Sequence, residues 1–367
     1  SVGVTEIANF AKYEVTGPGA EAWLDHLMTN TMPKAGRLVL TPMLNDNGKL
    51  IGDFTIAKAS EGRFLIWGSL GASKYHMRWF EQHLPQDGSV TVRRFHMDLV
   101  GLSVCGPKAR AVLAKLVDTD VSNAAFRFMD FREMDVAAAP CMVNRITYSG
   151  DLGYEIWMKP SYQRRVYTAI KAAGAEFGIV DFGMRALLSM RLEKNFPTWF
   201  AELRPIYGPY EGAMDRFIKP QKPDFIGRAA AIRERDEGPR RRRVSLVIEA
   251  GTADVMADEP IWARVGDVDY GTIGAPHGYG APRFDAAGAE VAKPDPARDG
   301  DWRVVGWVTS GGYAHYVGQS MAQGYLPAAL AERGEAGLFE VEIMGERRPA
   351  RIALEPPFDP QGERMRM

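Results

Sequence analysis

The alternation of apolar and polar positions predicts a mixture of strands and helices before about residue 234. The predicted strands are residues 48–57, 63–67, 142–148 and 154–158, and the predicted helices are residues 73–83, 161–177 and 182–194. In the helix at 161–177, Tyr167, Ile170 and Ala173 recur at three-residue spacing, which indicates an amphipathic helix that buries this face. The pattern is that of an α+β protein.

The two halves of this region share a short repeated sequence, the internal echo. Residues 14–27 and 103–116 match without a gap at seven of fourteen positions, namely one Val, one Gly, one Pro, two Ala and two Leu. Each copy reads as a strand, a Gly-Pro turn and a helix, with the Pro in the first helical turn, where its missing N–H costs nothing. Gly-Pro turns before helices are common, but the number of matches favours two related α+β lobes.

A boundary is expected at residues 234–239, which separate an N-terminal unit of residues 1–233 from a C-terminal unit of residues 240–367. The C-terminal unit reads as short strands joined by turns, which is typical of a small all-β domain. Within it, residues 268–300 are rich in Gly, Pro, Ala and Asp and are interpreted as an insertion or long loop. The arginine run at 240–243 leads into a strand and is either a solvated lead-in or an attractor for an acidic ligand tail.

Composition excludes several classes of protein. The 45 Lys and Arg against 46 Asp and Glu leave no global positive charge, so no nucleic-acid partner is expected. No run of about 18 apolar residues is present, so no membrane-spanning helix is expected. The two cysteines, Cys105 and Cys141, are too few for a disulfide framework, which suits a reducing compartment and a cytoplasmic location. The chain starts abruptly without a signal peptide, which suggests a missing upstream segment.

Two carboxylates stand out in the predicted strands. Asp53 shares a strand face with Ile51 and Thr55 in a largely apolar segment, so it is either at a solvated face or buried for a purpose. Glu155 shares a face with Trp157. A carboxylate beside an aromatic ring suits a flat heterocycle with N–H donors, although the pattern alone favours a cross-strand ion pair.

The helix at 182–194 holds further charges. Arg185, Arg191 and Glu193 span about two turns and either line an inner groove or, for Arg191 and Glu193, form a structural ion network under the following loop. The six histidines lack metal-ligand spacing, so no metal site is expected. A Gly-x-Ser-x-Gly elbow, a P-loop and a Gly-x-Gly-x-x-Gly fingerprint are all absent from the sequence.

Five short motifs resemble those of one known family. They are Phe10-Ala-Lys-Tyr-Glu-Val-Thr-Gly-Pro18, Tyr148-Ser-Gly-Asp-Leu-Gly-Tyr-Glu-Ile156, Met190-Arg-Leu-Glu-Lys-Asn195, Asp224-Phe-Ile-Gly-Arg228 and Val308-Thr-Ser-Gly-Gly312. Their order resembles the glycine-cleavage-system T-protein (aminomethyltransferase) superfamily, most closely the tetrahydrofolate-binding portion of dimethylglycine and sarcosine dehydrogenases. The resemblance implies two interleaved α+β lobes and a C-terminal β-barrel around a central folate channel. Residues 268–300 are expected to lie outside the common pattern.

The resemblance also implies roles for single residues. Asp53 corresponds to the second carboxylate of a Gly-x-x-Asp-Asp strand and is the expected catalytic aspartate, while Gly52 replaces the first. Glu155 and Arg185 fall on the pterin-binding glutamate and arginine. Phe10 stands where the T-protein has a methionine against the folate, and Trp199 where the family often has an aromatic residue. Asp53 would stabilise positive charge and relay a proton when tetrahydrofolate accepts an electrophilic one-carbon unit.

The resemblance implies a small methylated amine, such as dimethylglycine or sarcosine, as the carbon donor. The similar dehydrogenases carry an N-terminal flavin domain that oxidises the amine. A flavin-containing domain or subunit is therefore an expected partner, while this chain shows no flavin site of its own.

Two other functions remain open from the sequence. One is a stand-alone folate-dependent demethylase that moves an intact methyl group from a sulfonium, ether or ammonium donor. The other is a non-catalytic folate-binding regulatory module like the iron–sulfur-assembly relatives of the T-protein. Those relatives carry a Lys-Gly-Cys-Tyr-x-Gly-Gln-Glu motif, and the corresponding segment here, Glu193-Lys-Asn-Phe-Pro-Thr-Trp199, has no cysteine.

Overall fold

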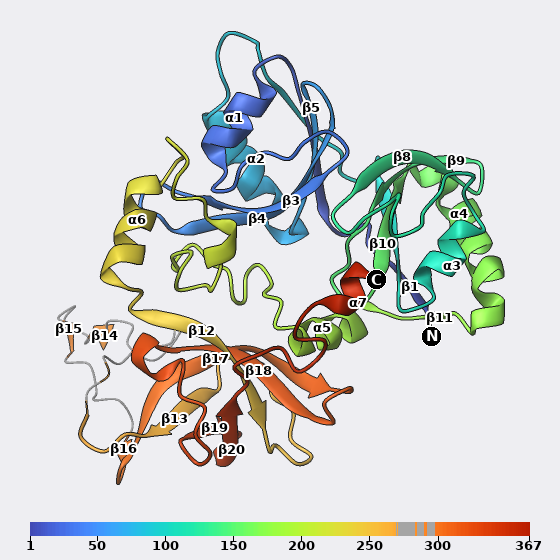
Figure 1. Cartoon of the computed structure of the whole chain (residues 1–367). Coiled ribbons are helices and arrows are strands. Elements are labelled where there is room, and N and C mark those ends of the chain that lie inside the picture. Colours follow the sequence, from blue (N-terminus) through green and yellow to red (C-terminus); the bar gives the residue numbers. More distant parts are fainter. Residues whose placement is uncertain (269, 271–282, 285–289, 292–297) are drawn as a thin grey trace.

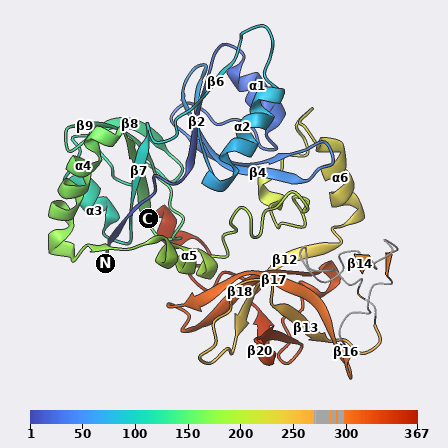
Figure 2. The same cartoon turned by 180° about the vertical axis from the view of Figure 1, so that it is seen from behind.

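The computed structural model of the chain describes residues 1–268, 270, 283–284, 290–291 and 298–367 (Figure 1). These residues form two α+β lobes and a β-barrel. Both chain ends lie at the second lobe (Figures 1 and 2). Most of the stretch that the sequence predicts to be an insertion, residues 268–300, falls outside the described residues.

The first lobe is built on a five-stranded sheet of order β3-β4-β5-β2-β6. Its elements are β2 (Ala11–Thr16), α1 (Ala20–Leu27), β3 (Leu38–Leu44), β4 (Leu50–Ser60), β5 (Arg63–Gly68), η1 (Leu70–Ala72), α2 (Ser73–Gln82) and β6 (Thr91–Arg94). The hairpin of β4 and β5 turns at Gly62, whose φ of 66° favours glycine. The predicted strands and helix of this region are confirmed to within a few residues.

The second lobe has a six-stranded sheet of order β11-β1-β7-β10-β9-β8. Its elements are β1 (Gly3–Glu6), β7 (Val100–Cys105), α3 (Ala109–Ala114), β8 (Phe131–Val136), β9 (Ala139–Asn144), β10 (Gly153–Met158), α4 (Pro160–Gly174), η2 (Ala175–Phe177) and β11 (Val180–Asp181). Because β1 belongs to this sheet and β2 to the other, the chain starts in the second lobe, builds the first and returns. The lobes are therefore interleaved, as expected.

The internal echo corresponds to a repeated unit. Residues 14–27 cover the end of β2 and all of α1, and residues 103–116 cover the end of β7 and all of α3. In each copy the Gly before Pro, Gly17 or Gly106, has a positive φ of 125° or 116°. A Cβ there would lie 2.1 Å or 2.7 Å from a backbone oxygen of another segment, so the turn requires glycine.

The buried face of α4 differs from the one predicted. Val166, Ile170 and Gly174 are buried, whereas Tyr167 is 37% exposed and donates a hydrogen bond to Asp181. The buried residues recur every four positions, so the three-residue spacing that starts at Tyr167 drifts off the core face. The prediction that Tyr167 belongs to this face was wrong.

The C-terminal unit is a closed six-stranded barrel of order β13-β19-β20-β12-β18-β17, in which β13 also pairs with β17. Its strands are β12 (Arg241–Ile248), β13 (Pro260–Arg264), β17 (Trp302–Ala314), β18 (Gln319–Pro327), β19 (Phe339–Ile343) and β20 (Glu346–Ile352). Short pieces are β14 (Arg283–Phe284), β15 (Glu290–Val291), β16 (Arg298–Asp299) and η4 (Ala328–Leu330). The predicted limits of the units, 1–233 and 240–367, stay a prediction.

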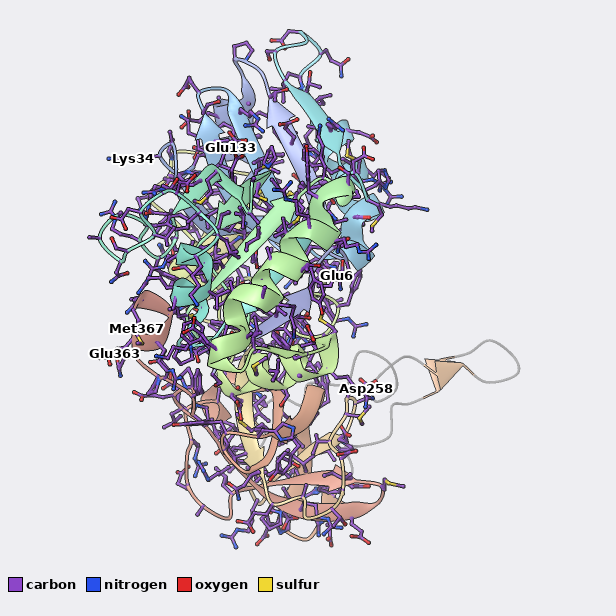
Figure 3. All side chains as sticks on the ribbon, turned by 90° about the vertical axis from the view of Figure 1, so that its right-hand side faces the viewer. Glu6, Lys34, Glu133, Asp258, Glu363 and Met367 are labelled. Carbon is purple, nitrogen blue, oxygen red and sulfur yellow. The ribbon has the colours of Figure 1, made fainter. Side chains whose placement is uncertain are left out.

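Connecting segments hold the three parts together. They are α5 (Met184–Glu193), η3 (Asp215–Phe217), α6 (Arg228–Glu237) and α7 (Glu363–Arg366). The ring of Tyr207, from the segment after α5, stacks on Tyr325 of the barrel with centroids 3.9 Å apart. The C-terminal segment runs back to the second lobe, where Arg364 pairs with Asp151 at 3.0 Å. Figure 3 shows Glu363 and Met367 together at the junction of the second lobe and the barrel.

Candidate active site between the two lobes

The sheets of the two lobes meet along a seam of aromatic side chains. The rings of Trp67 on β5 and Trp157 on β10 lie 5.8 Å apart between centroids, in one buried apolar cluster. Trp67 pairs across the strands with Thr55 on β4, so Asp53 is the next residue of β4 on the same face. Glu155 is likewise the next residue before Trp157 on its face of β10. Both carboxylates therefore border this seam.

Apart from its own backbone N–H, the carboxylate of Asp53 has no hydrogen-bond or ion-pair partner among the described residues. It lies in the middle of β4, opposite Pro42 of β3. Burial raises the pKa of its carboxyl from 3.8 to about 6. At neutral pH the group is thus mostly ionised and keeps its charge without a cation, which is a costly arrangement for a purely structural residue.

Glu155 is similarly isolated from cations. Asn144, directly opposite on β9, donates a hydrogen bond to Oε2 at 3.3 Å. Burial raises the pKa of Glu155 to about 7, and the Asn144 amide and the Trp157 indole N–H each oppose the rise. The alternative of a cross-strand ion pair is wrong within the described residues, because no cation pairs with Glu155.

Tyr148 also belongs to the candidate site, although no role was predicted for it. It follows β9, and its hydroxyl donates a 2.5 Å hydrogen bond to the carbonyl of Pro197 in the segment after α5. Burial raises the pKa of the Tyr148 phenol, and the carboxylates of Glu202 and Asp53 add to the rise. Tyr148 therefore lies within electrostatic range of Asp53 on the other lobe. Its position at the start of the 148–156 motif was the available signal.

The structure places two predicted aromatic residues on different sides of the site. Phe10, between β1 and β2, meets Trp157 edge to face with centroids 6.2 Å apart. Trp199 is 5% exposed, packs in the core of the first lobe and meets His76 edge to face at 5.6 Å. Phe10 is thus next to Trp157, the neighbour of Glu155 on β10. Trp199 instead lies in the same core cluster as Phe54 of β4. Their predicted contacts with folate stay predictions.

Arg185 is not brought to Glu155 by the structure. It lies in the first turn of α5 with an exposed side chain, and no hydrogen bond or ion pair joins it to another described residue. The buried face of α5 is instead formed by Leu187, Arg191 and Leu192. The predicted role of Arg185 on the pterin stays a prediction.

Arg191 and Glu193 are both structural, but they do not pair with each other. The guanidinium of Arg191 binds the carboxylate of Glu202 at 2.9 Å. The side chain of Arg191 is 3% exposed and that of Glu202 is fully buried. Glu202 also receives hydrogen bonds from the backbone N–H of Thr198 and the hydroxyls of Thr309 and Ser310. Glu193 accepts the backbone N–H of Tyr316. These bonds fix the segment after α5 to the barrel.

The arginine run at 240–243 is mostly used internally. Arg241 pairs with Glu211 and Arg242 with Asp215. Arg243 is buried and donates to Asn195, Gln323 and the carbonyl of Gly212. Three of the four arginines therefore serve the junction of barrel and lobes, which leaves Arg240 alone as an exposed group.

The absence of the first carboxylate at position 52 has a local cause. A Cβ on Gly52 would lie 2.5 Å from the Phe54 ring and 3.2 Å from Nε2 of His76. His76 is fully buried, and burial lowers its pKa to about 4, so it is neutral. The packing of Phe54 against His76, with ring centroids 4.7 Å apart, leaves no room for a second aspartate.

The residues of the seam fit a flat polar heterocycle better than a metal ion. No group of three His, Cys, Asp or Glu side chains that could hold a metal occurs in the part of the chain that the structure describes. Near Glu155, Oδ1 of Asn144 is buried without a hydrogen-bond partner. A carboxylate with an adjacent amide oxygen can accept several N–H bonds, which is what a pterin ring edge offers.

A groove of about 930 Å³ reaches the seam from outside. Trp157 is among its lining residues, and Arg63, which also lines it, pairs with Glu14 of the first lobe and Glu133 of the second at 2.8 and 2.9 Å. Neither Asp53 nor Glu155 lines this groove. It is therefore separate from the two carboxylates.

Comparison with known proteins gives matches along the whole chain. The family model described as the GCVT N-terminal domain matches residues 1–222, and the glycine cleavage T-protein C-terminal barrel domain matches residues 282–359. The second match begins inside the stretch 268–300, and the prediction of an insertion there stays a prediction. Within the described residues, no helix is long and apolar enough to cross a membrane.

Curated relatives are similar over most of this chain. Dimethylglycine dehydrogenase of Mus musculus is 32% identical over 97% of the chain, and sarcosine oxidase subunit alpha of Rhizobium meliloti is 27% identical over all of it. The chain spans only 37% and 34% of these two proteins. An aminomethyltransferase of Moorella thermoacetica is 26% identical over 96% of the chain and 86% of its own length.

Among solved structures, the aminomethyltransferase T of the glycine cleavage system from Bartonella henselae is similar with a TM-score of 0.77. The likeness covers 98% of this chain and 87% of that one at 21% identity. It shows a common fold.

Proposed function

Because the chain belongs to the glycine cleavage T-protein family, we propose that it is a tetrahydrofolate-dependent one-carbon transferase that takes its carbon from an N-methylated amine. Dimethylglycine and sarcosine are the proposed donors. Support comes from the names of two relatives, a dimethylglycine dehydrogenase and a sarcosine oxidase subunit, which match nearly all of this chain. A cytoplasmic location stays a prediction.

The observation that carries the proposal is the pair of carboxylates along one seam. Asp53 and Glu155 lie on different lobes, both have pKa values raised by burial, and no cation among the described residues pairs with either. Retaining two such groups costs stability, which is typical of functional sites. Their environments differ enough to give them different roles.

Glu155 is proposed to hold the N–H edge of the pterin, with Asn144 fixing the carboxylate from the opposite strand. Tetrahydrofolate supplies the nitrogen that accepts the one-carbon unit. Asp53, with a pKa of about 6, is mostly ionised at neutral pH, where it stabilises nearby positive charge and takes up a proton at its carboxylate oxygen. Phe10 is proposed to bound the ring face beside Trp157.

The amine must be oxidised before its carbon becomes electrophilic. A flavin-containing domain or subunit is the proposed source of that oxidation, as the resemblance to dimethylglycine and sarcosine dehydrogenases implies. In both of the longer relatives, the matched region is about a third of the protein. The site in this chain would then receive the reactive one-carbon product rather than generate it.

The first test is calorimetric titration with folinic acid, a stable reduced folate. We expect saturable micromolar binding that Glu155→Ala weakens at least tenfold, because the variant loses the acceptor of the pterin N–H groups. Glu133→Ala, which changes an exposed carboxylate on the same lobe, is the matched control. No binding by folded wild-type protein would contradict the proposal.

The second test separates transfer from mere binding. The chain is incubated with tetrahydrofolate and formaldehyde, or with each methylated donor and an amine-oxidising flavoenzyme, and the folate product is identified by mass. Methylene-tetrahydrofolate is expected, and its enzyme-dependent formation should fall at least a hundredfold in Asp53→Ala. Methyl-tetrahydrofolate formed without an oxidant would indicate the demethylase alternative.

Arg185 is tested separately. Because its side chain is exposed and unbonded among the described residues, Arg185→Ala should leave the thermal midpoint unchanged. If Arg185 steadies the pterin, the variant binds folinic acid more weakly. Unchanged affinity would remove Arg185 from the site.

A further inference from the structure

One ammonium group is buried in the seam between the lobes. Lys12 is 2% exposed on β2, directly opposite Trp67 of β5, so its side chain is on the face that meets the second lobe. Burial lowers its pKa to about 8, with the charge of Glu6 opposing the shift. At pH 7 the group is still mainly charged. No part of the proposed chemistry uses it.

The partners of Lys12 are unusual for a buried lysine. Nζ donates a hydrogen bond to the carbonyl of Ala8 at 2.7 Å and lies 5.8 Å from the centroid of the Trp157 ring. It has no ion pair with a carboxylate in the described part of the chain. Lys58 of the same sheet is also buried, but it pairs with Glu21 at 2.6 Å and Glu61 at 2.9 Å. Lys12 thus uses its charge on a carbonyl and an aromatic face.

Both of these contacts lead to residues of the proposed folate site. Trp157 is two residues from Glu155 on one strand face, and its indole N–H lies close enough to oppose the raised pKa of that carboxyl. Ala8 belongs to the segment between β1 and β2 that also carries Phe10, which meets Trp157 in a T-shaped ring contact. One cation therefore contacts the two supports of the pterin-binding position.

We propose that Lys12 is a positioning residue of the folate site, which orients Trp157 toward Glu155 and fixes the Phe10 segment through the Ala8 carbonyl. A cation over an indole is attracted to its negative face and polarises the ring, which strengthens the N–H as a donor. The hydrogen bond to Ala8 closes a short turn around Phe10. The inference rests on the proposed function, since it assigns Lys12 to that same site.

The test measures folinic acid affinity at pH 7 for Lys12→Met and Lys12→Arg in the full chain. Methionine retains an unbranched side chain without the charge, and arginine retains the charge. We expect about tenfold weaker binding in Lys12→Met, equivalent to about 1.4 kcal/mol, and recovery of most of the affinity in Lys12→Arg. The matched control is Lys58→Met, which removes another buried ammonium of this sheet away from Trp157 and should leave the affinity unchanged.

A double-mutant cycle with Trp157→Phe tests the coupling even if Lys12→Met lowers stability. Phenylalanine removes the N–H and weakens the attraction for a cation, so Lys12→Met should cost less affinity in that background than in the wild type. Equal losses in both backgrounds, or affinity unchanged in Lys12→Met, would overturn the role of Lys12. If wild-type protein fails to bind folinic acid at all, the proposed function fails instead.

Discussion

The side-chain nitrogen of Asn144 lies 3.3 Å from Oε2 of Glu155, and the two residues are direct neighbours on β9 and β10. A neutral amide can orient a carboxylate but brings no positive charge to it. The effect of burial is therefore larger than that of the hydrogen bonds to Glu155, and the pKa of Glu155 rises to about 7. The site is prepared for a ligand that supplies further N–H donors.

Replacing the buried carboxyls with amides should stabilise the protein at high pH. The folded-state pKa values of Asp53 and Glu155 lie above their unfolded values, so the folded state binds more protons between about pH 4 and pH 7. As the pH rises through this window, the free energy of unfolding therefore falls by up to about 3 kcal/mol for each of the two acids. Asp53→Asn and Glu155→Gln should raise the thermal midpoint at pH 8, with less gain at pH 5.

The matched control for this effect is Asp118→Asn at an exposed position, which should change the midpoint little at either pH. A lower midpoint of both amide variants at pH 8 would mean that the ionised carboxylates are stabilised by contacts in the folded protein. That result would contradict the assignment of both groups as isolated.

Folate binding should release protons near neutral pH. Pterin N–H donors favour the ionised form of Glu155, so binding lowers a pKa that starts at about 7. At pH 7 we expect release of up to about half a proton, and weaker affinity as the pH falls below 7. Calorimetric titrations in phosphate and Tris, which differ in ionisation enthalpy, measure this number directly. Glu155→Gln should abolish this proton release. An unchanged proton release in the variant would mean that the proton comes from another group.

Local patterns were enough to predict the strands that hold the two carboxylates. The period of two along β4 correctly separated Asp53 from Phe54 and Ile56, which face the core of the first lobe. The Gly-Pro echo correctly predicted two related units, since each copy holds its strand end, turn and helix within fourteen consecutive residues. The family motifs then selected Asp53 and Glu155 as candidate site residues, and their roles stay predictions.

Contacts between distant segments could not be predicted in the same way. Tyr148 is placed near Asp53 only by the meeting of the two lobes. Arg191 pairs with Glu202 rather than with nearby Glu193, because the chain after α5 folds back against the barrel, where Glu202 also meets Thr309 and Ser310. On α4, a small error in the helical period moved the predicted face to Tyr167. For Tyr148 and Arg191 the missing information is a tertiary distance.

Adding a side chain at Gly52 should destabilise the first lobe. The new Cβ of Gly52→Ala would lie 2.5 Å from a Phe54 ring that is itself buried against His76, so neighbouring groups must shift. We expect a loss of about 1–3 kcal/mol in the free energy of unfolding, measured by urea denaturation. Gly312→Ala is the control on another strand, where the nearest atom is 3.5 Å away. Equal stability of the two variants would show that the Phe54 ring relaxes freely.

The buried pair of Arg191 and Glu202 should be sensitive to the loss of one partner. Their side chains are only 3% and 0% exposed, so Arg191→Met leaves a carboxylate buried with neutral donors alone. We expect a loss of about 3–5 kcal/mol in the free energy of unfolding at pH 8. A second change, Glu202→Gln, should restore part of this loss.

For the exposed pair of Arg93 and Asp98, Arg93→Met should cost less than about 1 kcal/mol. Similar costs at the two arginines would mean that water reaches Glu202, and that the segment after α5 is held by its packing against the barrel rather than by this charge.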